Sequence, residues 1–117
     1  MTRRDKSEGP LAREQLKGHL DLLLLAILQT GPAHGYEIIT ALRDRSDGTF
    51  DLPEGTVYPA LHRLEAAGRL TSAWSETGGR RRRTYQLTGD GVVALRAERG
   101  AWHSFSAGIG AVLAGTA

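Results

Sequence analysis

Residues 53–69 read PEGTVYPALHRLEAAGR, and this stretch decides the fold. Pro53 and Glu54 are typical of a first helical turn, and Gly68 is typical of the position just after a helix. Between them, apolar residues recur at the spacing of one helical face: Val57, Leu61, Leu64 and Ala67. The pattern predicts a helix with one buried stripe and an outward face.

Residues 70–88, LTSAWSETGGRRRRTYQLT, predict a β-hairpin directly after that helix. Two segments with β-favouring residues, Leu70–Glu76 and Arg83–Thr88, flank the turn sequence Thr77-Gly78-Gly79. Arg80–Arg83 are expected at the tip and at the start of the return strand. A helix pair followed by a two-stranded ribbon with a basic tip is the outline of a winged helix-turn-helix.

Three further helices are predicted around this unit. The first covers Leu11–Thr30 and is apolar nearly all round, so a second subunit is expected to supply part of its cover. The second covers His34–Arg45, with a capping-box spacing at its start. The last begins after Thr88 and carries a seam of residues seven apart, which is typical of a helix that packs on a partner helix: Leu95, Trp102 and Ile109. The predicted fold class is mainly α with a small β-hairpin.

The composition is that of one soluble domain, with 117 residues, 40% of them hydrophobic, and a formal net charge of +2. The chain has no cysteine, which excludes disulfides and thiolate metal sites. The longest apolar run, Leu22–Leu28, is far shorter than the ~20 residues that cross a bilayer, and no export signal is visible. We therefore expect a cytoplasmic protein with no membrane partner. Residues 55–88 hold six arginines and two glutamates, which suggests a polyanionic partner.

Catalysis is not expected. The four histidines form no His-Glu-x-x-His pair, and the sequence has neither a phosphate-binding P-loop nor a nucleophile elbow. His34 and Glu37 share a helix face, but helix capping explains this pair better than metal binding does. We expect no cofactor and no metal.

A helix whose inner face is buried can lie in the major groove of DNA, and an arginine ribbon beside it can bind the backbone or enter the minor groove. The residues expected on or near the outward faces of this helix are Thr56, Tyr58, Pro59, His62 and Arg63. Thr56 and His62 can hydrogen-bond bases, and Tyr58 can bond a phosphate or pack on a sugar. The alternatives are that Tyr58 and His62 are ordinary surface residues and that Arg80–Arg83 form a solvated loop.

Several segments together resemble the PadR family of transcriptional regulators. They are Gly18–Leu28, Gly35–Ile38, Pro53–Glu65, Gly79–Tyr85 and Leu87-Thr88 with Gly91. The resemblance implies a homodimeric winged-helix repressor that binds double-stranded DNA. It also implies that a small molecule commonly releases the repressor from its operator. It implies DNA contacts from Tyr36, Thr56, Tyr58, Pro59, His62 and Arg80–Arg83. Tyr36 has the alternative of packing under its own helix.

The chain would then divide into a flexible arm over residues 1–10, a DNA-binding domain over 11–88 and a dimerisation helix over 89–117. The dimer interface is expected at Leu20, Leu24, Leu95, Trp102 and Ile109. Trp102 and Phe105 are the expected contacts of a planar aromatic effector, by resemblance to multidrug-sensing relatives, although packing is the alternative for Trp102. Trp74 is expected to pack in the wing.

A rival function is a winged-helix module that binds an acidic protein without sequence-specific DNA binding. RNA binding is a weaker rival, because no exposed aromatic platform for bases is evident.

Overall fold

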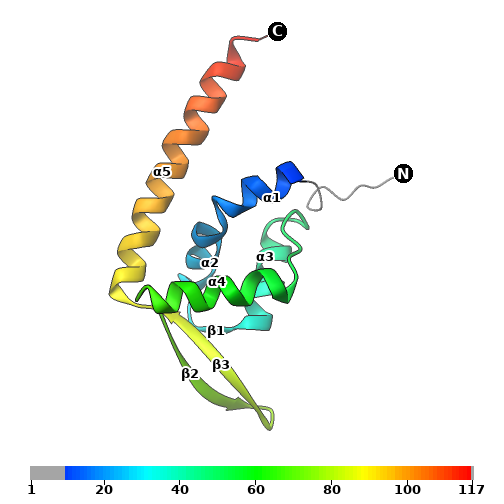
Figure 1. The fold of residues 1–117 in the computed structure, drawn as a ribbon, viewed down its shortest axis with the longest axis vertical. Coiled ribbons are helices and arrows are strands. Elements are labelled where there is room, and N and C mark those ends of the chain that lie inside the picture. Colours follow the sequence, from blue (N-terminus) through cyan, green and yellow to red (C-terminus); the bar gives the residue numbers. More distant parts are fainter. Residues whose placement is uncertain (1–9, 117) are drawn as a thin grey trace, which may run out of the picture.

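The structure, a computed structural model, describes residues 10–116 (Figure 1). In chain order its elements are α1 (Pro10–Lys17), α2 (Leu20–Leu28), β1 (Ala33–His34), α3 (Gly35–Arg45), α4 (Glu54–Ala66), β2 (Leu70–Thr77), β3 (Arg80–Leu87) and α5 (Gly89–Ala114). The three strands form an antiparallel sheet in the order β1-β3-β2. The predicted fold class, a mainly helical winged helix-turn-helix with a long C-terminal helix, is confirmed.

The prediction of a single helix over Leu11–Thr30 is wrong, because the helix is interrupted between α1 and α2. Glycine is a poor helix former, and Gly18 is followed by His19 with φ −128° and ψ −3°, outside the helical region. The His19 N–H bonds the Leu16 carbonyl at 2.9 Å and closes a turn there. The predicted arm lies outside the described residues, apart from Pro10, with which α1 begins.

The core is centred on α2, whose Leu24 and Leu25 are fully buried. The expectation that a second subunit covers this helix is not needed, because α3, α4, α5 and β3 of the same chain all pack against it. The other large, fully buried side chains come from three different elements, α3, α4 and β3: Ile38, Val57, Leu61, Leu64 and Tyr85. A helix that is apolar all round is thus explained by its central place in the fold.

The helix α3 begins with the predicted capping box. The Glu37 carboxylate accepts the backbone N–H of His34 at 3.0 Å, and the His34 ring accepts the N–H of Glu37. His34 also ends β1, a two-residue strand that sequence patterning did not predict and that pairs with β3 through Ala33↔Tyr85 and His34↔Thr84. The strand ties the start of α3 to the wing.

The helix α5 is attached to the rest of the molecule by its first turns. The Thr88 hydroxyl accepts the Gly91 N–H at 3.0 Å and donates to the Gly68 carbonyl at 2.7 Å, as expected of a helix cap. Leu95 is its last buried side chain, and beyond it the helix extends away from the core, on the side opposite to the β2–β3 hairpin (Figure 1). No helix within residues 10–116 combines the length and the apolar character needed to cross a membrane.

Candidate nucleic-acid interface

The helix α4 presents one buried and one outward face, as its sequence predicts, except that Ala67, which was expected in the buried stripe, is exposed just past the end of the helix. Val57, Ala60, Leu61 and Leu64 are buried at intervals of three and four residues. Among the outward residues, Pro59 and His62 are exposed and Thr56 is half-buried. Pro59 lies within the helix and removes one donor from its hydrogen-bond ladder, close enough to the first turn for the helix to continue.

Tyr58 lies differently from its neighbours on α4. Its phenol ring packs against the first residue of α3, so closely that a Cβ added at Gly35 would overlap the ring. The side chain is half-buried against the core, and the expectation that it lies on the outward face is corrected accordingly. Gly35 permits this close approach because it has no Cβ, and the contact joins segments 23 residues apart in the sequence.

Arg63 is exposed but forms an ion pair with Asp21 of α2. The Asp21 carboxylate neutralises part of the charge that α4 would otherwise present to an anion. This pair joins residues 42 positions apart in the sequence, so no local pattern could predict it.

The wing is a hairpin whose two-residue turn fixes the position of every arginine. Gly78 and Gly79 have φ of 60° and 79°, the left-handed values that such a turn requires. β3 begins at Arg80, not at Arg83 as predicted, so all four arginines lie in the strand and alternate between its two faces. Arg81 and Arg83 lie on one face, and Arg80 and Arg82 lie on the other.

The two faces of the wing are bound to different helices. On one face, the Arg83 Nε donates to the Ser72 hydroxyl at 2.8 Å, and this hydroxyl donates to the Glu65 carboxylate of α4 at 2.7 Å. On the other face, an Arg82 guanidinium nitrogen lies 2.8 Å from the His34 Nε2 at the start of α3. These contacts fix the wing beside α4, while Arg80 and Arg81, nearer the turn, are exposed.

Two aromatic residues of the wing region have opposite environments. Burial raises the pKa of the Tyr85 phenol above its ordinary value, an effect that the Arg83 guanidinium partly offsets. Trp74 was expected to pack, but 56% of its surface is exposed, so that expectation is wrong. The Gly78-Gly79 turn sets the pairing of the two strands and places Trp74 directly across from Arg83.

Tyr36, which the sequence predicts as a DNA contact, lies in the first turn of α3 and is 63% exposed. It does not pack under its own helix, which was the alternative. Its predicted contact with DNA stays a prediction.

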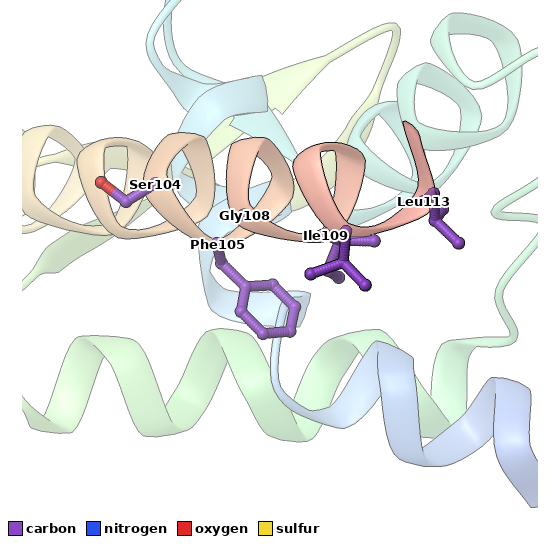
Figure 2. A pocket seen from close by; sticks show the side chains of 6 residues that line it. Ser104, Phe105, Gly108, Ile109 and Leu113 are labelled. Atoms are coloured by element: carbon purple, nitrogen blue, oxygen red, sulfur yellow. The ribbon is translucent and has the colours of Figure 1, made fainter. Parts of the chain in front are cut away.

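The residues expected in the dimer interface separate into two groups. Leu20, Leu24 and Leu95 are buried inside one chain and have almost no surface that a partner could contact. We therefore remove these three residues from the predicted interface. Trp102 and Ile109 are exposed on α5, where further large apolar side chains extend the same surface: Phe105, Val112 and Leu113. Figure 2 shows Phe105, Ile109 and Leu113 pointing to one side of α5, where they line a shallow apolar hollow.

A second hollow lies between α5 and the turn that joins α1 to α2. It is lined by Gly18, His19, Leu22, Glu98, Ala101, Trp102 and Phe105. The His19 and Trp102 rings meet edge to face, with centroids 5.1 Å apart. The two predicted effector contacts, Trp102 and Phe105, therefore lie together here, with ring centroids 6.3 Å apart.

Comparison with known proteins agrees with this geometry. The chain is 33% identical to the transcriptional regulator YqjI of Escherichia coli over 74% of its own length, and the match spans 42% of that longer protein. Solved structures of PadR family regulators also match. The one from Eggerthella lenta has a TM-score of 0.78 at 32% identity, with 91% of each chain covered. The one from Clostridium difficile has a TM-score of 0.73 at 33% identity, with 81% of this chain and 98% of that chain covered.

The model of the transcriptional regulator PadR-like family matches residues 24–97, which run from the core of α2 through the wing to the first turns of α5. This range contains α4 and all four wing arginines. With this match and the shared winged-helix architecture, the chain belongs to the PadR-like family of DNA-binding transcriptional regulators.

Proposed function

We propose that this chain is a homodimeric repressor that binds a palindromic operator, with α4 in the major groove and the wing on the adjacent backbone and minor groove. The observation that carries the proposal is the position of an arginine hairpin directly beside the outward face of α4. Ser72, Arg83 and Glu65 connect the two elements, so they would meet DNA as one surface.

The dimensions of α4 suit this role. Its 13 residues make a helix about 20 Å long, whose exposed Pro59 and His62 lie on the face away from the core. The DNA contacts in this proposal are Tyr36, Thr56, Pro59, His62, Arg63 and Arg80–Arg83. Tyr58 has an indirect part, because it packs α4 against the start of α3.

The second copy is proposed to pair through α5. Large apolar side chains are exposed along this helix beyond the core, and a second α5 laid against them would remove them from water. Trp102, Phe105 and Ile109 would form the centre of the interface. Two copies related by a two-fold axis would then place their α4 helices on successive major-groove faces, about 34–36 Å apart.

A planar aromatic effector is proposed to bind at Trp102 and Phe105, in the hollow that His19 and Glu98 also line. A flat ring can stack on Trp102, and binding beside α5 would change the angle between paired subunits and release the operator. A Trp74→Phe variant keeps Trp102 as its only tryptophan, because the chain has two. Such a ligand should quench the fluorescence of Trp102 in this variant, and adding the ligand should weaken operator binding. A full ligand response in Trp102→Ala would refute this site.

The test of the main proposal is selection of preferred duplexes from a random pool, followed by light scattering of the purified protein. We expect an inverted repeat and a mass of twice the 12.6 kDa of one chain. Because its partner is chromosomal DNA, we place the protein in the cytoplasm. A pool without any preferred sequence would favour the rival function, a winged-helix module that binds an acidic protein partner through the same arginines.

A further inference from the structure

Trp74 is an exposed tryptophan on a basic hairpin, and its ring is covered by guanidinium groups. The Arg81 and Arg83 guanidinium carbons lie 4.8 Å and 5.3 Å from the centroid of the indole. These distances are those of cation–π pairs, in which the arginine side chains lose part of their freedom before any ligand arrives. More than half of the Trp74 surface nevertheless stays in contact with water.

The side of the hairpin that carries Trp74 is the side that faces α4. Side chains two residues apart on a strand share a face, so Trp74 lies on the same face as Leu70 and Ser72. Leu70 is buried in the core, and Ser72 donates to Glu65 of α4. Trp74 lies further along this face, beyond the residues that contact the helix. Figure 1 shows the hairpin leaving α4 at an angle. Because Trp74 is on the α4-facing side of the hairpin, it faces this angle.

That angle has a specific occupant if α4 enters a major groove and the wing reaches the next minor groove. The element of DNA between two adjacent grooves is one sugar–phosphate backbone strand. A surface that contacts this strand needs positive charge for the phosphates and apolar area for the deoxyribose rings. Arg81 and Arg83 supply the charge, and the indole of Trp74 supplies the apolar area.

We propose that Trp74, Arg81 and Arg83 form a backbone clamp, in which the indole packs on a deoxyribose and the two guanidinium groups bind the flanking phosphates. Trp74 has two parts in the clamp, because it contacts the sugar and holds the arginines in place through their stacking on its ring. This inference rests on the proposed function, since it requires duplex DNA in contact with α4 and the wing.

The opposite face of the hairpin makes the proposal specific to Trp74. Arg82 lies on that face, where one of its guanidinium nitrogens contacts His34 and the side chain has no aromatic ring to stack on within the described part of the chain. Ala73 also lies there, exposed and next to Trp74 in the sequence. An Ala73→Leu variant adds apolar surface to the wing on the side away from α4, and it is the matched control.

The test is a double-mutant cycle on a labelled duplex taken from the random-pool selection, with affinity measured by fluorescence anisotropy at two salt concentrations. The variants are Trp74→Leu, Trp74→Phe, the pair Arg81→Gln with Arg83→Gln, and the triple combination of that pair with Trp74→Leu. We expect Trp74→Leu to weaken binding at least about tenfold per dimer, because the stacking of four guanidinium groups is lost. Trp74→Phe should keep part of the affinity, because a smaller aromatic face remains.

Two readouts separate the clamp from a merely structural role. In the background without Arg81 and Arg83, Trp74→Leu should have a clearly smaller effect than in the parent, since its arginine partners are gone. In Trp74→Leu, the slope of log affinity against log salt should be less steep than in the parent. The difference should be at most about 3.6 per dimer, the value expected if all four phosphate contacts are lost. Thermal unfolding of Trp74→Leu should stay close to that of the parent, because the indole is mostly exposed.

Parent-like affinity in Trp74→Leu would overturn the clamp while leaving the proposed function intact. An equal loss with and without the two arginines, or an equal loss in Ala73→Leu, would overturn it as well. Failure of the parent itself to prefer any duplex would instead refute the proposed function.

Discussion

Gly91 is the point at which α5 is attached to the DNA-binding unit, and replacing it with alanine should loosen this attachment. The residue is buried in the first turn of α5. A Cβ at this position would overlap the Arg69 carbonyl oxygen and come within 3.3 Å of the Leu87 Cδ2. The same carbonyl accepts the Thr88 N–H at 3.2 Å, so the obstacle is a backbone group held in place.

The expected magnitude follows from two opposing terms. A methyl group forced into a packed site costs about 1–3 kcal/mol, and the upper end applies because no side-chain rotamer can relieve contact with a backbone oxygen. Alanine is favoured over glycine in a helix by about 1 kcal/mol, which offsets part of this cost. Gly91→Ala should therefore lower the free energy of unfolding by about 2 kcal/mol.

Gly100→Ala is the matched control in the same helix. A Cβ at Gly100 meets no heavy atom within 4 Å, so only the helix-propensity term remains and the variant should gain about 0.5–1 kcal/mol. Urea unfolding followed by circular dichroism at one protein concentration measures both variants, since the proposed dimerisation would make stability depend on concentration. A Gly91→Ala variant as stable as Gly100→Ala would refute the argument that this close approach anchors α5.

Three further variants test other contacts. Asp21→Asn removes the ion-pair partner of Arg63 and should lower the unfolding free energy by less than about 1 kcal/mol, because the pair is at the surface. The same variant should bind DNA more tightly and with a steeper salt dependence, both measured by anisotropy. Gly35→Ala displaces the Tyr58 ring from the start of α3 and should lower both the unfolding free energy, by about 1–3 kcal/mol, and DNA affinity, measured by urea unfolding and by anisotropy. Leu61→Ala empties a fully buried site on α4 and should cost about 3–5 kcal/mol in urea unfolding.

Each of these variants has a control. Asp44→Asn makes the same charge change at the exposed end of α3, and equal tightening of DNA binding in both asparagine variants would contradict a specific role for the Arg63 pair. Gly55→Ala adds a methyl group on α4 into open space, so its stability should not fall. Val93→Ala truncates an exposed side chain and should change stability by less than about 0.5 kcal/mol. A Leu61→Ala cost as small as this would contradict the placement of α4 on the core.

Local patterns predicted the elements that depend on short-range chemistry. The Pro53-Glu54 start, the Gly68 stop and the apolar spacing of Val57 and Leu61 identified α4 with nearly the observed bounds. The Gly78-Gly79 turn identified the hairpin, and counting outward from this turn gives the observed register. These features depend on backbone conformations that a few residue types prefer.

Long-range contacts explain most of what the sequence did not predict. The two-residue strand β1 exists only because it pairs with β3, about 50 residues later. Leu20 and Leu24 resembled interface residues because a single apolar stripe cannot distinguish the core from a partner subunit. The pair of Asp21 with Arg63 and the packing of Tyr58 on Gly35 also join distant segments. Trp74 shares a strand face with the buried Leu70, and it is exposed because it lies beyond the part of the hairpin that α4 covers, which the register alone does not show.

Hydroxyl-radical footprinting of the selected duplex tests most directly whether α4 and the wing bind DNA as one surface, twice per dimer. Two protected regions are expected, with centres 10–10.5 base pairs, or a small multiple of this, apart. Each should be accompanied by protection of a neighbouring minor groove that disappears when Arg80–Arg83 are replaced by glutamine. A single protected region, or minor-groove protection that persists without these arginines, would contradict the account.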